Sequence, residues 1–121
     1  MRILSPWVHG ILDLVTVGVL VLAPNALGLG GSPAAIAYSL AAIHLLMTLI
    51  TDFPMGVWKR IPFFVHGIVE LIVGVALLIL PSYAGYGPGS PARRFYLAIG
   101  AVILVVWALT AYRERTAAAE A

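Results

Sequence analysis

Four long runs of apolar residues dominate the chain, separated by short segments rich in glycine, proline or charge. They cover about Pro6–Ala23, Pro33–Thr51, Pro62–Leu80 and Pro91–Tyr112. Each run is close to the roughly 20 residues that cross a hydrocarbon core of about 30 Å as a helix. The pattern therefore predicts an all-α fold class, a bundle of four transmembrane helices.

Proline opens each of the four runs, and three of these prolines follow a serine. Proline has no N–H group to leave unpaired at the first helical position, and a preceding serine can cap the helix. Pro24 and Pro81 directly follow the first and third runs. We therefore expect no proline inside a helix and no kinked helix.

The overall composition agrees with a membrane protein. The 121 residues are 62% hydrophobic, with only seven Lys or Arg and five Asp or Glu, whereas a soluble domain carries about 25% charged residues. This balance excludes soluble, disordered and fibrous classes and leaves the lipid bilayer as the main partner. The basic residues form no stripe, so we expect no nucleic-acid partner. Cysteine is absent, which excludes thiolate chemistry and Cys-based metal sites.

The basic residues flank the apolar runs and predict an orientation. Five lie on the side of the N-terminus, the second connection and the C-terminus: Arg2, Lys59, Arg60, Arg113 and Arg115. Two lie on the other side: Arg93 and Arg94. Because cytoplasmic loops carry an excess of Lys and Arg, both termini are predicted to be cytoplasmic.

The chain also repeats itself at an offset of 57 residues. The clearest matches are Val8-His9-Gly10-Ile11 with Val65-His66-Gly67-Ile68, Asp13 with Glu70, and, after one inserted residue, Ser32-Pro33 with Ser90-Pro91. The short connections predict one integral membrane domain over residues 1–121, with a first repeat at about 6–52 and a second at about 63–112. Each repeat is a two-helix hairpin, so this is a parallel repeat about an axis along the membrane normal. The first and third helices should face each other.

This unit resembles the SPW-repeat family of small prokaryotic membrane proteins, whose pattern is an aromatic-led helix, a proline turn with a downstream glycine, and a second apolar helix. The matching residues are Trp7, Pro24 and Gly28, then Phe64, Pro81 and Gly85. The family places Ser-Pro-Trp at the end of the first helix, whereas here Ser5-Pro6-Trp7 stands at its start. The resemblance implies a four-helix protein of the prokaryotic inner membrane, and it brings no catalytic residue.

Ionisable residues inside the apolar runs point to a buried site. His9 and Asp13, and likewise His66 and Glu70, are four residues apart, which places each pair on one helix face. The second run adds His44 and, at its end, Asp52. An ionisable residue at mid-membrane costs about 2.5–3.5 kcal/mol, so such groups persist when they face inward and satisfy each other. We expect all six to converge in the cytoplasmic half of the bundle.

Imidazole and carboxylate ligands suit Zn²⁺, Fe²⁺ or Mn²⁺, so the leading hypothesis is a transition-metal site. Its candidate ligands are His9, Asp13, His44, Asp52, His66 and Glu70.

Other functions are compatible with the same residues. His9 and His66, at matching repeat positions, are candidate axial ligands of a haem. Buried carboxylates and histidines also mark proton-linked transporters or carriers, for which four short helices would have to form a homo-oligomer. The polar groups are alternatively structural, fixing helix register by hydrogen bonds. No nucleophile stands out, so the sequence favours a binding protein over an enzyme.

Overall fold

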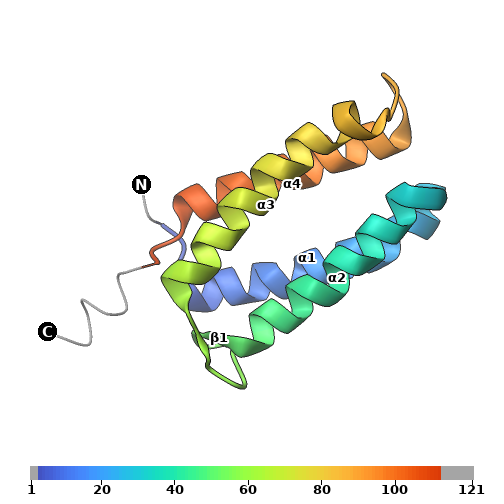
Figure 1. The fold of residues 1–121 in the computed structure, drawn as a ribbon. Helices are drawn as coiled ribbons and strands as arrows, with labels where there is room; N and C mark the ends of the chain where they lie inside the picture. The colour runs from blue at the N-terminus through green and yellow to red at the C-terminus, as the bar shows by residue number, and fades with distance from the viewer. Residues whose placement is uncertain (1–2, 113–121) are drawn as a thin grey trace, which may run out of the picture.

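The computed structural model describes residues 3–112, which form four long helices and two short strands (Figure 1). In chain order the elements are α1 (Pro6–Ala26), α2 (Gly31–Ile50), β1 (Thr51–Asp52), β2 (Ile61–Pro62), α3 (Phe63–Ala84) and α4 (Pro91–Leu109). All four helices are long and apolar enough to cross a membrane. The predicted fold class, all-α with four helices of membrane-spanning length, is confirmed.

The predicted serine caps form at two helix starts. The Ser5 hydroxyl accepts a hydrogen bond from the Val8 amide at 3.2 Å, and the Ser90 hydroxyl accepts one from the Arg93 amide at 3.1 Å. These bonds satisfy amides that have no partner within the first turn. α2 begins two residues earlier than predicted, at Gly31, and has no side-chain cap.

Two helix ends differ from the prediction, because α1 and α3 continue past Pro24 and Pro81. The expectation that no proline lies inside a helix was wrong. A proline in the last turn removes a single N–H donor, and later amides still find carbonyl partners. The Leu27 amide donates to the Ala23 carbonyl at 2.8 Å, for example. α3 ends at Gly85, whose φ of +77° is a left-handed conformation that glycine adopts readily.

The helices pack as two hairpins, α1 with α2 and α3 with α4, which lie side by side (Figure 1). Two short parallel pairings join the hairpins at one end. Thr51 of β1 pairs with Ile61 of β2, and Leu4, before α1, pairs with Thr110, after α4. We call this the polar end of the bundle. The sequence did not predict either pairing.

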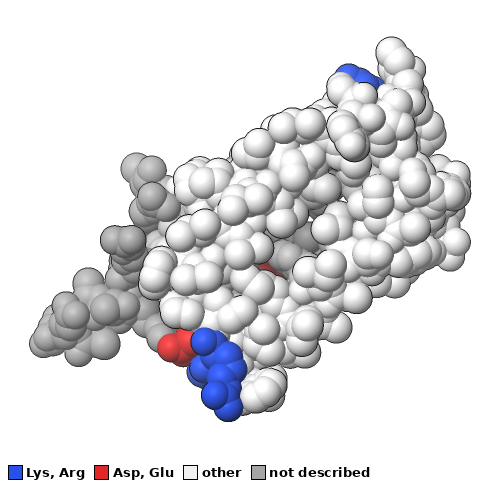
Figure 2. Space-filling view, in the orientation of Figure 1, with Lys and Arg blue, Asp and Glu red and all other residues white. Residues whose placement is uncertain are grey.

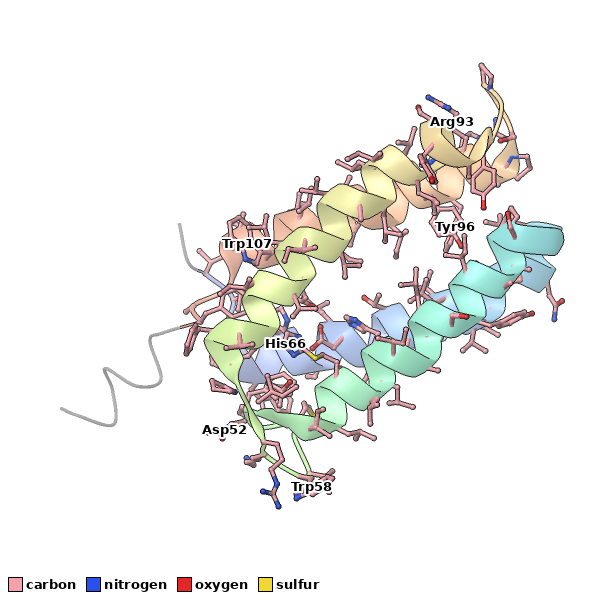
Figure 3. The ribbon with its side chains drawn as sticks, viewed as in Figure 1. Asp52, Trp58, His66, Arg93, Tyr96 and Trp107 are labelled. Carbon is pink, nitrogen blue, oxygen red and sulfur yellow. The ribbon has the colours of Figure 1, made fainter. Side chains whose placement is uncertain are left out.

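The opposite half of the bundle has an apolar core. It includes Leu20 of α1, Ala37 of α2, Leu77 of α3 and Ile99 of α4. Two polar contacts between described residues join the hairpins there. The buried Tyr96 hydroxyl donates to the Pro33 carbonyl at 2.6 Å (Figure 3), and the hydroxyl groups of Ser32 and Tyr86 are hydrogen-bonded at 2.8 Å.

The outer surface is what a bilayer requires. Large apolar side chains such as Leu22, Ile43, Ile72 and Val105 are exposed on the four helices. Figure 2 shows an almost uncharged face, with Lys and Arg confined to its two ends. The predicted flanking residues Arg2, Arg113 and Arg115 lie outside the described residues. The helical surface is therefore suited to contact with lipid.

Candidate metal centre

Two fully buried histidines form the core of the site, His9 on α1 and His66 on α3. Figure 3 labels His66. The four-residue spacing puts each ring against the carboxylate of its own helix, as predicted. His9 Nε2 lies 3.2 Å from Asp13 Oδ1, and His66 Nε2 lies 3.3 Å from Glu70 Oε1.

Contacts between the two helices close these pairs into one group. His9 Nε2 lies 3.1 Å from Glu70 Oε2, and His66 Nε2 lies 3.3 Å from Asp13 Oδ2. Imidazole nitrogens and carboxylate oxygens thus alternate around a common centre. We call His9, Asp13, His66 and Glu70 the four-residue cluster; their ligand atoms all lie within 4.8 Å of one another and could hold a metal ion.

The contacts inside the cluster are close, but several are not hydrogen bonds. His9 Nε2, His66 Nε2 and Asp13 Oδ2 are buried and have no hydrogen-bond partner. Such orphaned groups are costly in an apolar interior. Four ligands around Zn²⁺ at about 2.0–2.1 Å lie roughly 3.3 Å apart in a tetrahedron. The four nitrogen–oxygen contacts of 3.1–3.3 Å, which involve both oxygens of each carboxylate, are close to that spacing.

Two threonines fix the orientation of the rings. His9 Nδ1 lies 2.8 Å from the Thr110 hydroxyl oxygen, and His66 Nδ1 lies 2.8 Å from that of Thr51. Each hydroxyl also donates to the carbonyl four residues earlier, at 2.6 Å for Thr110 and 2.5 Å for Thr51. Because a hydroxyl has a single proton, each Nδ1–H must be the donor to its threonine. A neutral ring then directs the Nε2 lone pair into the cluster, as a metal ligand does.

Aromatic rings cover the cluster on the side of the polar end. Phe53 and Phe63 are buried and stacked, with ring centroids 5.0 Å apart, and Phe63 also contacts Tyr112 at 4.7 Å. We call Phe53, Phe63 and Tyr112 the aromatic cap. Gly67 allows its close approach, because a Cβ atom there would lie 2.8 Å from the Tyr112 ring.

Tyr112 also reaches the cluster directly. Its hydroxyl donates a hydrogen bond of 2.8 Å to Glu70 Oε2. Burial, together with the negative charge of Glu70, raises the pKa of Tyr112 well above its usual range. The phenol therefore keeps its proton at neutral pH and holds one carboxylate oxygen in place.

His44, the third predicted histidine ligand, lies beside the four-residue cluster. Its Nε2 is 3.4 Å from Asp13 Oδ1, and its side chain is 14% exposed, whereas those of His9 and His66 are fully buried. His44 Nε2 also has no hydrogen-bond partner. It is therefore an additional candidate metal ligand at the edge of the site.

Asp52, the sixth predicted ligand, is not part of this group. It lies in β1, and Figure 3 shows it toward the connection that carries Trp58, away from His66. Successive strand residues point to opposite sides. Since Thr51 contacts His66, Asp52 is directed away from the cluster, and the expectation that all six residues converge has to be corrected.

The sequence analysis did not predict the roles of Thr110 and Tyr112. A signal was present, because both second helices of the hairpins are followed by threonine, one further residue and an aromatic: Thr51-Asp52-Phe53 and Thr110-Ala111-Tyr112. In both segments the threonine contacts a histidine and the aromatic joins the cap.

Comparisons with protein-family models, with curated proteins and with solved structures found no match to this chain. The resemblance to the SPW-repeat family therefore stays a prediction.

Proposed function

We propose that this integral membrane protein binds one divalent transition-metal ion through His9, Asp13, His66 and Glu70. The observation that carries the proposal is the pair of imidazole Nε2 atoms that lack hydrogen-bond partners yet lie 3.1–3.3 Å from carboxylate oxygens of both helices. A cation between these atoms would satisfy all of them at once.

The donor set selects the class of metal. Two imidazoles with two carboxylates suit Zn²⁺, Fe²⁺ or Mn²⁺ better than Cu⁺, which prefers sulfur, or Ca²⁺ and Mg²⁺, which prefer oxygen alone. A divalent ion also cancels the charge of Asp13 and Glu70. That balance matters because an uncompensated buried charge costs several kcal/mol.

Haem binding by His9 and His66 fits this arrangement less well. The oxygens of Asp13 and Glu70 lie 3.1–3.3 Å from the imidazole Nε2 atoms, in the space that the macrocycle would need. Transport through the bundle has little support either, because the buried hydrophobic cluster between the described helices occupies the half beyond the site.

We further propose that the two hairpins are related by a pseudo-two-fold axis, with both termini on the cytoplasmic side of a prokaryotic inner membrane. Support for the axis comes from matched contacts. His9 contacts the threonine after α4, and His66 contacts the threonine after α2. Support for the orientation is the excess of Lys and Arg at the polar end in the sequence.

Elemental analysis of the purified protein tests the metal proposal. We expect about one Zn, Fe or Mn per chain in wild type and none in the double variant His9→Ala/His66→Ala, because both nitrogen ligands are lost. Asp52→Asn is the matched control, since it removes a carboxylate outside the cluster, and it should keep the metal. A metal-free wild type, or equal metal content in the double variant, would contradict the proposal and leave the polar residues a structural role.

A further inference from the structure

We compare two clefts between the hairpins, of which one is lined by a residue of the four-residue cluster and the other is not. The cleft between α1 and α4 has a volume of about 300 Å³ and is lined by residues such as Val15, Val19, Val102 and Val106. Its one polar side chain, Thr16, donates to the carbonyl of its own helix. None of the four cluster residues lines it.

The cleft between α2 and α3 leads to the candidate metal centre. Its walls are apolar, with Ile43 and Met47 from α2 and Val69 and Val73 from α3, and its polar residues are His44 and Glu70. Figure 2 shows this hollow on the helical face, with acidic atoms visible at its floor. This cleft therefore opens from the cluster to the lipid-facing side of the bundle.

The aromatic cap covers the cluster toward the polar end of the bundle. Phe53 is fully buried and Phe63 is 5% exposed, and the two rings contact the imidazoles of His66 and His9, respectively. The α2–α3 cleft therefore offers a molecule in the bilayer a route to the cluster.

The size of the cleft limits the molecule that fits. Its volume is about 60 Å³. This is well below the roughly 150 Å³ of a cavity that holds a benzene ring, so a small head group fits, whereas a quinone ring does not. The rest of an unbranched chain would remain along the apolar mouth of the cleft.

Charge limits the head group. With a divalent ion bound, the charges of Asp13 and Glu70 are balanced, so this step rests on the proposed function. A head group of either charge would then enter the apolar cleft without a partner of opposite charge, which is costly. We infer that the α2–α3 cleft binds a single-chain lipid with a neutral terminal oxygen, such as a long-chain alcohol, which enters from the bilayer and places its oxygen beside His44 and Glu70.

Photo-crosslinking tests this inference on the full chain in lipid nanodiscs. The probe is cetyl alcohol carrying a diazirine near its hydroxyl end, and labelled peptides are identified by mass spectrometry. We expect labels around Ile43–Met47 and Val69–Val73, lowered about tenfold by excess cetyl alcohol, as for a saturable site. Palmitate and hexadecane should compete much less.

A matched pair of variants separates the clefts. Val73→Trp fills the α2–α3 cleft and should abolish the competed labelling while metal content stays at the wild-type level. Val106→Trp fills the α1–α4 cleft and should change neither. Equal labelling of both clefts, equal competition by palmitate, or unchanged labelling in Val73→Trp would overturn the inference. Metal content of the same samples tests the proposed function separately, since competed labelling of a metal-free protein supports the cleft site and contradicts the metal.

Discussion

The two carboxylates of the cluster come from matching positions on α1 and α3, yet their surroundings differ. Asp13 faces three imidazoles, those of His9, His44 and His66, at 3.2–3.4 Å. Glu70 faces two imidazoles, and its remaining neighbour is the Tyr112 hydroxyl at 2.8 Å. The position that corresponds to Tyr112 in the first half is Phe53, which has no hydroxyl to donate.

Contacts that occur in both halves of the chain have a different role from contacts that occur in only one half. We call their positions shared and unshared, respectively. Both halves provide an imidazole Nε2, a carboxylate and a threonine behind the ring, which is the set that a bound ion needs. His44 and Tyr112 occur in one half each and orient a carboxylate. Substitutions at shared positions should therefore have large and similar effects, and those at unshared positions smaller and unequal ones.

The largest effect is expected for Asp13→Asn and Glu70→Gln, which keep the shape of the side chain but remove its charge. Both should lose the metal, and the free energy of unfolding should fall by about 3–5 kcal/mol, because the partner groups stay buried and uncompensated. Asp13→Asn should be the more severe, since it faces more imidazoles. Elemental analysis and thermal unfolding measure both effects, and full metal content in either variant would count against a shared site.

The next largest effect concerns the threonines. Thr51→Val and Thr110→Val remove the oxygen that accepts from Nδ1, so each should weaken metal affinity about 10–100-fold. Competition with a chelator gives the affinity. Thr48→Val is the control, because the buried Thr48 hydroxyl donates to the His44 carbonyl of its own helix. A strong effect at one of the two histidine-bound threonines and none at the other would show that the halves are not equivalent.

A smaller, one-sided effect is expected for Tyr112→Phe. The variant loses a hydrogen bond to a charged group, worth about 1.5–3 kcal/mol, and should bind metal about tenfold or more weakly. The ring stays and keeps its packing against Gly67, so the metal-free protein should lose no more stability than this one hydrogen bond provides. Unchanged metal affinity in the same chelator assay would mean that the phenol does not orient Glu70.

The smallest effect is expected for His44→Leu. His44 lies at the edge of the cluster, 3.4 Å from Asp13 and partly exposed, so its loss should weaken metal binding less than tenfold. Titration of the apo-protein with Zn²⁺ measures this. Complete loss of the metal would instead make His44 a ligand equal to His9 and His66.

Local spacing predicted much of this molecule. Helix length and hydropathy predicted four spans, since both depend on neighbouring residues alone. The spacing of four between His9 and Asp13, and between His66 and Glu70, predicted ligand pairs because those residues share a helix face. That the two pairs meet followed from the match between the first and third helices.

The spacing of residues along the chain could not predict the side-chain directions just after α2 and α4, because these depend on where the helices end. α2 and α4 end at Ile50 and Leu109, and the extended residues that follow alternate in direction. That alternation directs Thr110 and Tyr112 inward and Asp52 outward, whereas continued helices would have placed them differently. Pro24 and Pro81 stay helical because a last turn tolerates the loss of one donor.

The decisive test of metal binding by the four-residue cluster is a crystal structure with anomalous diffraction recorded at the Zn, Fe and Mn absorption edges. The account predicts one anomalous peak among His9 Nε2, His66 Nε2 and the carboxylates of Asp13 and Glu70, with metal–ligand distances of about 2.0–2.2 Å. A metal-free cluster in protein purified without chelators, with Nε2–H groups hydrogen-bonded directly to the carboxylates, would contradict it.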